Sequence, residues 1–233
     1  MTALRFCNNI IYFLGITCQL LAAVGIRKDR IENMSVSAAI LAGGKNLRMG
    51  RKNKAFLEIE GQSFLARTIA RLRPLFRQIM IIGPEDGGYS SFGLPVYPDI
   101  RPGSGSLGGI LTALRHSDAP KTFCVACDMP FLDPAVVTLL AERADEGWKA
   151  VIPRLPEGLE PLCAIYDVDL ADPIEQLLDR GEMRIRRLIE SELTCFVGVE
   201  ELRLFDPHLL TFVNINTPDD LEKASALSDG STA

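Results

Sequence analysis

The sequence predicts one α/β domain in which helices cover both faces of a mainly parallel sheet, a three-layer α/β/α arrangement. Apolar runs typical of buried strands alternate along the chain with stretches of helical period. In addition, 47% of the 233 residues are hydrophobic, which is enough to fill one full core. We expect the domain to span 36–228, after an N-terminal extension at 1–35 and before a loose polar tail at 229–233.

The expected strands are short apolar runs that end at glycine, proline or polar residues. In chain order they are 38–42, 55–59, 79–82, 94–97, 122–127, 150–152, 162–166, 194–199 and 210–215. At the end of the last strand, Asn214 and Asn216 are two residues apart, so both amides should leave the same face.

Capping residues mark where several expected helices begin. Ser63 precedes a helix at 64–73, and Asp133 starts one that ends near residue 144. Thr217 is followed by a proline and two aspartates, which is a strong start signal for a last helix. The remaining helices are expected at 110–116, 173–180 and 183–191.

Charge and cysteine content narrow the class of function. The formal net charge of −5 argues against a nucleic-acid partner, which would need a basic face throughout. The six cysteines form no clustered framework, so we expect reduced thiols in a cytoplasmic protein. Cys124 and Cys127 form a C-x-x-C on an expected strand, where residues three apart point to opposite faces, and no second Cys or His pair completes a zinc site.

An apolar run at 10–26 has three interpretations. Its length is at the short limit for a membrane span, and the early positive charge at Arg5 resembles a weak signal peptide. Met34 lies directly before the first expected strand, so the upstream segment also fits extra sequence from an early start site. We favour this last interpretation, in which the run is not a membrane anchor.

The loop after the first strand, 43–54, contains three glycines and five cations. Glycine lets backbone N–H groups approach phosphate oxygens, and cations such as Arg48 and Lys54 supply opposite charge, so the loop is suited to hold a triphosphate. It is not a Walker A loop, because no Ser or Thr follows Lys52 or Lys54. The alternative is an ordinary basic loop between a strand and a helix.

This loop resembles the signature of nucleotidyltransferases, in the form carried by molybdenum cofactor guanylyltransferases. The matching pieces are Leu41-Ala42-Gly43-Gly44, Arg48-Met49-Gly50 and Lys54. One residue departs from the pattern: the family usually has Asp before the final lysine, and this chain has Asn53. The resemblance implies that an aspartate at position 53 would tighten the loop and raise turnover.

A second glycine-rich segment precedes the helix expected at 110–116. Gly103, Gly105 and Gly108 spell G-x-G-x-x-G, and Asp128 follows near the end of the next strand, so an NAD-binding oxidoreductase is a distant alternative. Several residues separate the segment from the strand before it, whereas the dinucleotide fingerprint follows its strand at once. By resemblance, the segment is the family's Gly-x-Leu-Gly-Gly stretch, which covers the nucleotide from the side opposite the first loop.

The resemblance extends over about 36–225. It includes Ala126-Cys127-Asp128-Met129-Pro130, Glu160-Pro161-Leu162 and Asn214-x-Asn216-Thr217-Pro218. It implies a Rossmann-like sheet of the nucleotide-diphospho-sugar transferase type. The implied reaction transfers GMP from MgGTP to the terminal phosphate of molybdopterin, giving the guanine dinucleotide form and pyrophosphate. The implied partners are GTP, molybdopterin or the molybdenum cofactor, and cofactor-delivery proteins.

The resemblance also assigns roles to residues. Arg48, Lys54 and Asp128 are the catalytic candidates, and Asp128 is the expected Mg²⁺ ligand, since it is a hard carboxylate at a strand end. The expected nucleotide contacts are Leu41, Ala42, Gly43, Gly44, Lys54, Asp99, Gly108 and Asp128. The candidates for binding the second substrate are Arg184, Asn214 and Asn216. The competing interpretations are turn formation for Asp99 and Asp128, and a solvated helix face for Arg184.

Two other functions remain open at this stage. Cytidylyltransferases acting on the same cofactor share much of the pattern, and Leu-Ala-Gly-Gly in place of their usual Leu-Ala-Ala-Gly is the feature that favours GTP. A carboxylate at Asp99 suits guanine, because guanine presents an N1–H and an N2–H₂ side by side. Asn53 in place of Asp would also fit a nucleotide-binding accessory protein with little turnover.

Overall fold

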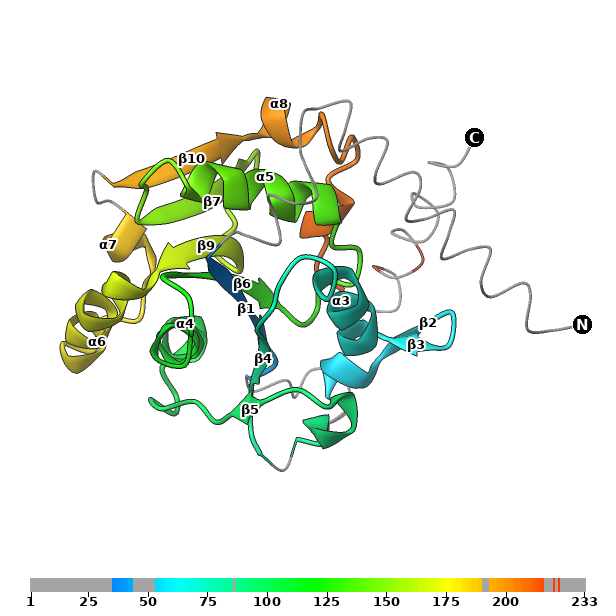
Figure 1. Ribbon diagram of the computed structural model, residues 1–233, viewed down its shortest axis with the longest axis horizontal. Helices are drawn as coiled ribbons and strands as arrows, with labels where there is room; N and C mark the ends of the chain where they lie inside the picture. The colour runs from blue at the N-terminus through cyan, green and yellow to red at the C-terminus, as the bar shows by residue number, and fades with distance from the viewer. Residues whose placement is uncertain are drawn as a thin grey trace, which may run out of the picture. The chain divides into compact units, whose positions relative to one another are not determined.

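The computed structural model describes residues 35–43, 53–85, 87–189 and 193–215, together with 220 and 222. They contain an eight-stranded sheet in the order β10-β7-β9-β6-β1-β4-β5, with β8 paired to β7 (Figure 1). The bounds are β1 Val36–Leu41, β4 Ile79–Ile82, β5 Val96–Tyr97, β6 Lys121–Ala126, β7 Ala150–Leu155, β8 Gly158–Leu159, β9 Cys163–Asp167 and β10 Thr194–Gly198. A separate hairpin pairs β2 Glu58–Ile59 with β3 Gln62–Ser63.

The middle of the sheet is parallel. Strand β1 runs parallel to β4 and β6, β4 to β5, and β10 to β7, whereas β9 is antiparallel to both of its neighbours. Leu41 is in register with Ile82 on one side and with Ala126 on the other. The chain segments that follow β1, β4 and β6 therefore leave the sheet at one shared carboxyl edge, which is where open α/β sheets bind ligands.

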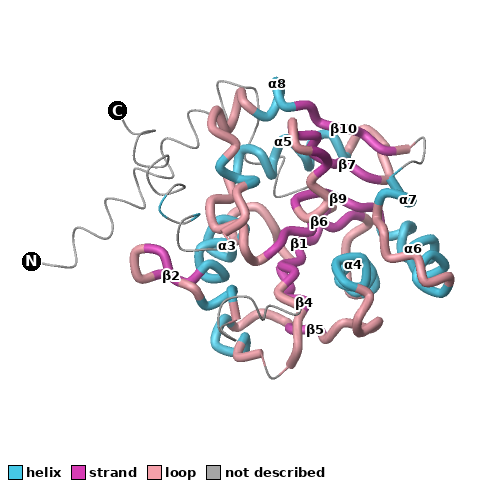
Figure 2. The backbone as a smooth tube through the Cα atoms, turned by 180° about the vertical axis from the view of Figure 1, so that it is seen from behind, coloured by secondary structure: helices cyan, strands magenta, loops and turns pink. Residues whose placement is uncertain are grey.

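Helices cover the two faces of the sheet. The α-helices are α3 Phe64–Leu72, α4 Gly105–Arg115, α5 Pro134–Ala144, α6 Ala171–Asp179, α7 Arg186–Ile189 and α8 Val199–Leu202. Short 3₁₀ turns lie at η1 Lys54–Phe56, η2 Tyr89–Phe92, η3 Val168–Leu170 and η4 Leu210–Phe212. Figures 1 and 2 place α4 and α6 on one side of the sheet and α3 and α5 on the other. This confirms the predicted three-layer arrangement with a mainly parallel sheet.

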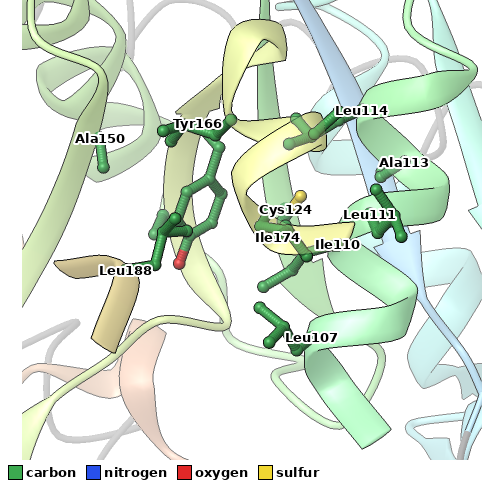
Figure 3. Close-up of a cluster of buried hydrophobic side chains, with 14 of the residues drawn as sticks. Leu107, Ile110, Leu111, Ala113, Leu114, Cys124, Ala150, Tyr166, Ile174 and Leu188 are labelled. Atoms are coloured by element: carbon green, nitrogen blue, oxygen red, sulfur yellow. The ribbon is translucent and has the colours of Figure 1, made fainter. Parts of the chain in front are cut away.

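The main core cluster lies between the sheet and the α4 and α6 layer. Leu107, Ile110 and Leu114 of α4 and Ile174 of α6 pack toward Tyr166 of β9 (Figure 3). Every residue of β1 is buried, because helices cover both faces of this central strand. This double covering explains why the central strands appear in the sequence as continuous apolar runs.

Three of the strand predictions are wrong in part or whole. The segment 55–59 begins as the 3₁₀ turn η1 and contributes only β2 to a hairpin. The segment 210–215 is not a strand: it contains η4, and 213–215 has no regular structure. The predicted strand at 94–97 is shortened to β5. At the start of 55–59 and of 210–215, a side chain accepts a hydrogen bond from the backbone and favours a turn.

Two helix predictions also change. The helix predicted at 110–116 begins at Gly105, so the glycine-rich segment forms its first turn. The helix predicted at 183–191 is reduced to α7, and residues 190–192 lie outside the described part of the chain. The extension at 1–34, the helix start at Thr217 and the polar tail also lie outside it. None of the helices within the described ranges is long and apolar enough to cross a membrane.

The buried carboxylate of Asp206 anchors the segment that returns to the carboxyl edge. It accepts hydrogen bonds from the backbone N–H groups of Leu210 at 3.0 Å and Thr211 at 2.7 Å. Thr211 in turn accepts at its hydroxyl a bond from the N–H of Asp133, just before α5. The segment then places Ile215, whose N–H donates to the carbonyl of Asp128 at 3.0 Å.

We expect Asp206→Ala to destabilise the fold by roughly 3 kcal/mol and to lower Tm by about 6–12 °C, because a buried N–H group and a part-buried one lose their acceptor. Thermal unfolding followed by circular dichroism measures this. Asp145→Ala is the matched control, since that aspartate is exposed at the end of α5 and should change Tm little. Equal Tm values for the two variants would contradict the anchoring role.

The described cysteines behave as the sequence predicted. Cys124, Cys127, Cys163 and Cys195 are free, and the first three are buried. Burial is the main cause that raises the pKa of the Cys127 thiol to about 12, so the thiol is protonated and unreactive near neutral pH. Within the described ranges, no group of three or more His, Cys, Asp or Glu side chains is placed to hold a metal ion.

Candidate active site

Strand β1 delivers the first loop to the carboxyl edge. The N–H of Ala42 donates to the carbonyl of Ile82 at 2.8 Å, and the carbonyl of Leu41 accepts from the N–H of Cys127 at 3.2 Å. Among the described residues, a Cβ added at Gly43 would meet only the carbonyl oxygen of Ile82, at 3.8 Å. The described residues around Gly43 therefore leave room for a Cβ.

An ion pair joins the two ends of the candidate site. Lys54 begins η1, and its Nζ lies 3.1 Å from Oδ2 of Asp128, which follows β6. The Lys54 side chain is only 9% exposed and that of Asp128 is 21% exposed. The structure thus brings two of the predicted site residues together at the carboxyl edge, although they lie far apart in the sequence.

A second carboxylate acts on the same region electrostatically. Burial is the main cause that raises the pKa of Glu160, and the negative charge of Asp128 raises it further. Glu160 is held by its backbone, whose N–H donates to the carbonyl of Pro153 at 3.0 Å, and its Oε1 accepts from the N–H of Leu162 at 3.2 Å. The sequence marked this segment by resemblance but gave Glu160 no role.

Asp99 and Gly108 meet at the amino end of α4. Asp99 Oδ1 accepts from the N–H of Arg101 at 2.9 Å, so the predicted turn-forming role is real. A Cβ added at Gly108 would lie 3.0 Å from each carboxylate oxygen of Asp99 and 2.9 Å from Cβ of Ser104. Only glycine therefore allows Asp99 to lie this close to the helix. Oδ1 also lies 3.4 Å from the hydroxyl of Thr112, which can donate to it, whereas Oδ2 accepts no hydrogen bond from a described residue.

The geometry of the glycine-rich segment does not match the dinucleotide fingerprint. Gly105 and Gly108 lie inside α4, and the strand before them, β5, is a two-residue strand at the edge of the sheet. The fingerprint needs a tight glycine turn directly after its strand. The fold thus gives no support to the NAD-binding alternative.

The remaining candidates are placed less closely. Asn214 directly precedes Ile215, whose backbone N–H donates to the carbonyl of Asp128. Asn214 is therefore one residue away from a backbone contact with Asp128. Arg184 is exposed just before α7, and it forms no ion pair with a described residue. Gly44, Arg48 and Asn216 lie outside the described residues.

The donor set at Asp128 fits a magnesium ion that arrives with a substrate. Mg²⁺ commonly uses one or two carboxylates and fills its other positions with water and substrate phosphates. Asp128 offers one partly exposed carboxylate, now paired with Lys54, and the described residues provide no preformed cage of ligands.

The sheet and its carboxyl edge define an α/β nucleotidyltransferase of the nucleotide-diphospho-sugar transferase fold. A solved structure similar to this chain is the molybdopterin-guanine dinucleotide biosynthesis protein A of Archaeoglobus fulgidus, with a TM-score of 0.72 and 31% identity. The match covers 83% of this chain and 99% of that one. The family described as MobA-like NTP transferase domain matches residues 38–195, and the chain belongs to this family.

Curated relatives agree with this assignment. A probable molybdenum cofactor guanylyltransferase of Clostridium perfringens is 40% identical over 80% of this chain and 94% of its own length. The molybdenum cofactor guanylyltransferase of Desulfosudis oleivorans is 33% identical over 82% of this chain and 95% of its own length. The resemblance drawn from the motifs is confirmed, and the protein is an enzyme of the nucleotidyltransferase class.

Proposed function

We propose that this enzyme transfers GMP from MgGTP to the terminal phosphate of molybdopterin, forming the guanine dinucleotide and releasing pyrophosphate. The observation that carries the proposal is the Lys54–Asp128 ion pair at the carboxyl edge of the sheet, the edge at which β1 ends. The names of the relatives at 33–40% identity support the choice of substrates.

The ion pair suits a substrate that carries both signs of charge. In the free enzyme, Lys54 and Asp128 neutralise each other at 3.1 Å. Nucleotide phosphates attract the lysine, and Asp128 is then free to hold the Mg²⁺, which would neutralise charge on the phosphates as the α-phosphorus is attacked. Lys54, whose side chain is only 9% exposed, can then act as a fixed cation on the phosphates without reorganisation of solvent.

The proposed reaction is an in-line displacement that needs positioning more than acid–base chemistry. An oxygen of the acceptor phosphate forms a bond to the α-phosphorus, and the bond from that phosphorus to the bridging oxygen of pyrophosphate breaks. In this proposal Arg48 stabilises the pyrophosphate as it leaves, and Arg184, Asn214 and Asn216 contact the second substrate. Leu41, Ala42, Gly43, Gly44 and Gly108 are assigned to the nucleotide.

We assign to Asp99 the selection of guanine over other nucleobases. Its Oδ1 is engaged by the N–H of Arg101. The hydroxyl of Thr112 also lies 3.4 Å from Oδ1, whereas Oδ2 accepts no hydrogen bond from a described residue. A carboxylate oxygen has two lone pairs, and we assign the N1–H and N2–H₂ groups of guanine to the acceptor positions that Asp99 retains, mainly on Oδ2. Cytosine presents no such pair of donors, which favours GTP over CTP at this site.

A panel of nucleotides tests the proposed function. Pyrophosphate release is followed with GTP, CTP, ATP and UTP, each with Mg²⁺ and molybdopterin, while binding is measured in parallel. We expect release with GTP to exceed release with the other nucleotides by at least about tenfold, the usual value of one good hydrogen-bonded contact. Release with CTP in preference to GTP would support a cytidylyltransferase, and binding without release would support an accessory protein.

A further inference from the structure

The hydroxyl of Tyr89 connects the two chain segments that form the site. Tyr89 lies in η2 and its side chain is fully buried. Its Oη donates to the carbonyl oxygen of Ala42 at 2.9 Å and accepts from Nδ2 of Asn53 at 2.8 Å. Ala42 follows β1 and Asn53 precedes Lys54, so one phenol spans the base of the first loop.

The direction of these hydrogen bonds is fixed by the chain itself. Oδ1 of Asn53 accepts from the N–H of Ala55 at 3.1 Å, capping η1. The other end of the amide, which carries only hydrogens, must therefore face Tyr89. Because Oη accepts from that NH₂ group, its own single proton is left for the carbonyl of Ala42.

The ring of Tyr89 is held in place by its surroundings. A Cβ at Gly83 would lie 2.9 Å from Cε2 of the ring, and a Cβ at Gly87 would lie 2.3 Å from the same atom. Phe56, in the η1 turn, stacks on the ring with centroids 5.7 Å apart and planes 12° apart. Burial is the main cause that raises the pKa of the phenol, so the hydroxyl remains protonated and able to donate.

We propose that Tyr89 is a positioning residue for nucleotide binding. Its hydroxyl sets the Ala42 carbonyl at the end of β1 and, through Asn53, the η1 turn that presents Lys54 to Asp128. The identity of the nucleotide rests on the proposed function, but the positioning itself does not. Asn53 suits this arrangement better than an aspartate, because an amide can both cap η1 and donate to Tyr89.

An aspartate at position 53 would disturb this arrangement. A carboxylate can accept from Ala55 but cannot donate to Tyr89. The single phenol proton would have to serve either the carboxylate or the buried carbonyl of Ala42, and one of the two acceptors would lose its partner. We therefore expect Asn53→Asp to weaken nucleotide binding, the opposite of what the family resemblance implied.

Tyr89→Phe tests the proposal, with Tyr166→Phe as the matched control. Tyr166 is equally buried and also donates its hydroxyl to a backbone carbonyl, that of Pro161, at 2.8 Å. Two quantities are measured: the Kd for MgGTP by calorimetry without acceptor, and hydrogen exchange of the backbone N–H groups at 53–57. We expect Tyr89→Phe to raise Kd by roughly 3- to 10-fold, the value of one hydrogen bond, and to speed exchange at 53–57. Tyr166→Phe should change neither.

A double variant separates positioning from a general loss of stability. In the Tyr89→Phe background the competition for the phenol proton no longer exists. We therefore expect Asn53→Asp to raise Kd by a smaller factor in this background than in the wild type. Failure of the wild-type protein to bind MgGTP would count against the proposed function. The exchange measurement needs no nucleotide, so it would still decide whether Tyr89 has the positioning role. Unchanged exchange at 53–57 in Tyr89→Phe would overturn the proposal, as would equal effects of the two Tyr→Phe variants.

Discussion

Asp128→Asn is expected to lower the rate of pyrophosphate release at saturating MgGTP by about a hundredfold or more. Asparagine keeps the shape of the side chain but removes the charge that would hold Mg²⁺ where negative charge develops on the phosphates. Contacts from Lys54 and the loop backbone do not depend on that charge, so the affinity for nucleotide should fall much less than turnover. Steady-state kinetics at varied Mg²⁺ and GTP concentrations separate the two quantities.

Asp118→Asn is the matched control for this experiment. Asp118 accepts a hydrogen bond from Oγ of Ser37 at the amino end of β1, on the edge of the sheet opposite the site. Asp118 is an aspartate of the same domain, and replacing its carboxylate with an amide should leave turnover unchanged. Near-normal turnover of Asp128→Asn at low Mg²⁺ would show that Asp128 only forms a turn.

Lys54→Ala is expected to weaken MgGTP binding by roughly 10- to 100-fold, the range for a charge-assisted hydrogen bond or two to phosphate. The loss should appear in Kd as well as in turnover, because the lysine contacts phosphates in the bound ground state. Removing it also leaves Asp128 without its partner at 3.1 Å. Calorimetry with MgGTP measures the affinity directly.

Lys121→Ala provides a comparable change away from the site. Lys121 also pairs with an aspartate, Asp167, at 3.2 Å, and both side chains are 14% exposed. It begins β6, at the opposite end of the strand from Asp128. This variant should lose stability but retain its affinity for MgGTP. Equal affinities for Lys54→Ala and Lys121→Ala would contradict a phosphate-binding role for Lys54.

The layered fold could be predicted because the central strands are buried on both faces. Strands β1, β4 and β6 are continuous apolar runs for this reason, and the helices between them show a helical period. The antiparallel direction of β9 could not be predicted, since an apolar run reads the same in either direction. The failed strand at 210–215 has a tertiary cause: the carboxylate of Asp206 bonds its backbone into a turn.

The site was predictable where motifs place residues at strand ends. The sequence marked Lys54 and Asp128 separately, and the parallel register of β1 and β6 places Asp128 at the same edge as the loop that leads to Lys54. The early start of α4 was missed because glycines disfavour helices, and the reason for Gly108, its contact with Asp99, is visible only in three dimensions. Tyr89 was missed entirely. Its only sequence signal is the pair of glycines before it.

The most direct test of guanylyl transfer is to label a phosphate of GTP and to determine whether the label appears in the pterin product. GTP labelled at the α-phosphorus, and separately at the γ-phosphorus, is incubated with the enzyme, Mg²⁺ and molybdopterin, and the pterin product is isolated. Nucleotidyl transfer at the Lys54–Asp128 edge should place the α label in the pterin product and the γ label in pyrophosphate. A pterin product that carries the γ label, or no labelled pterin while GTP is bound, would contradict guanylyl transfer.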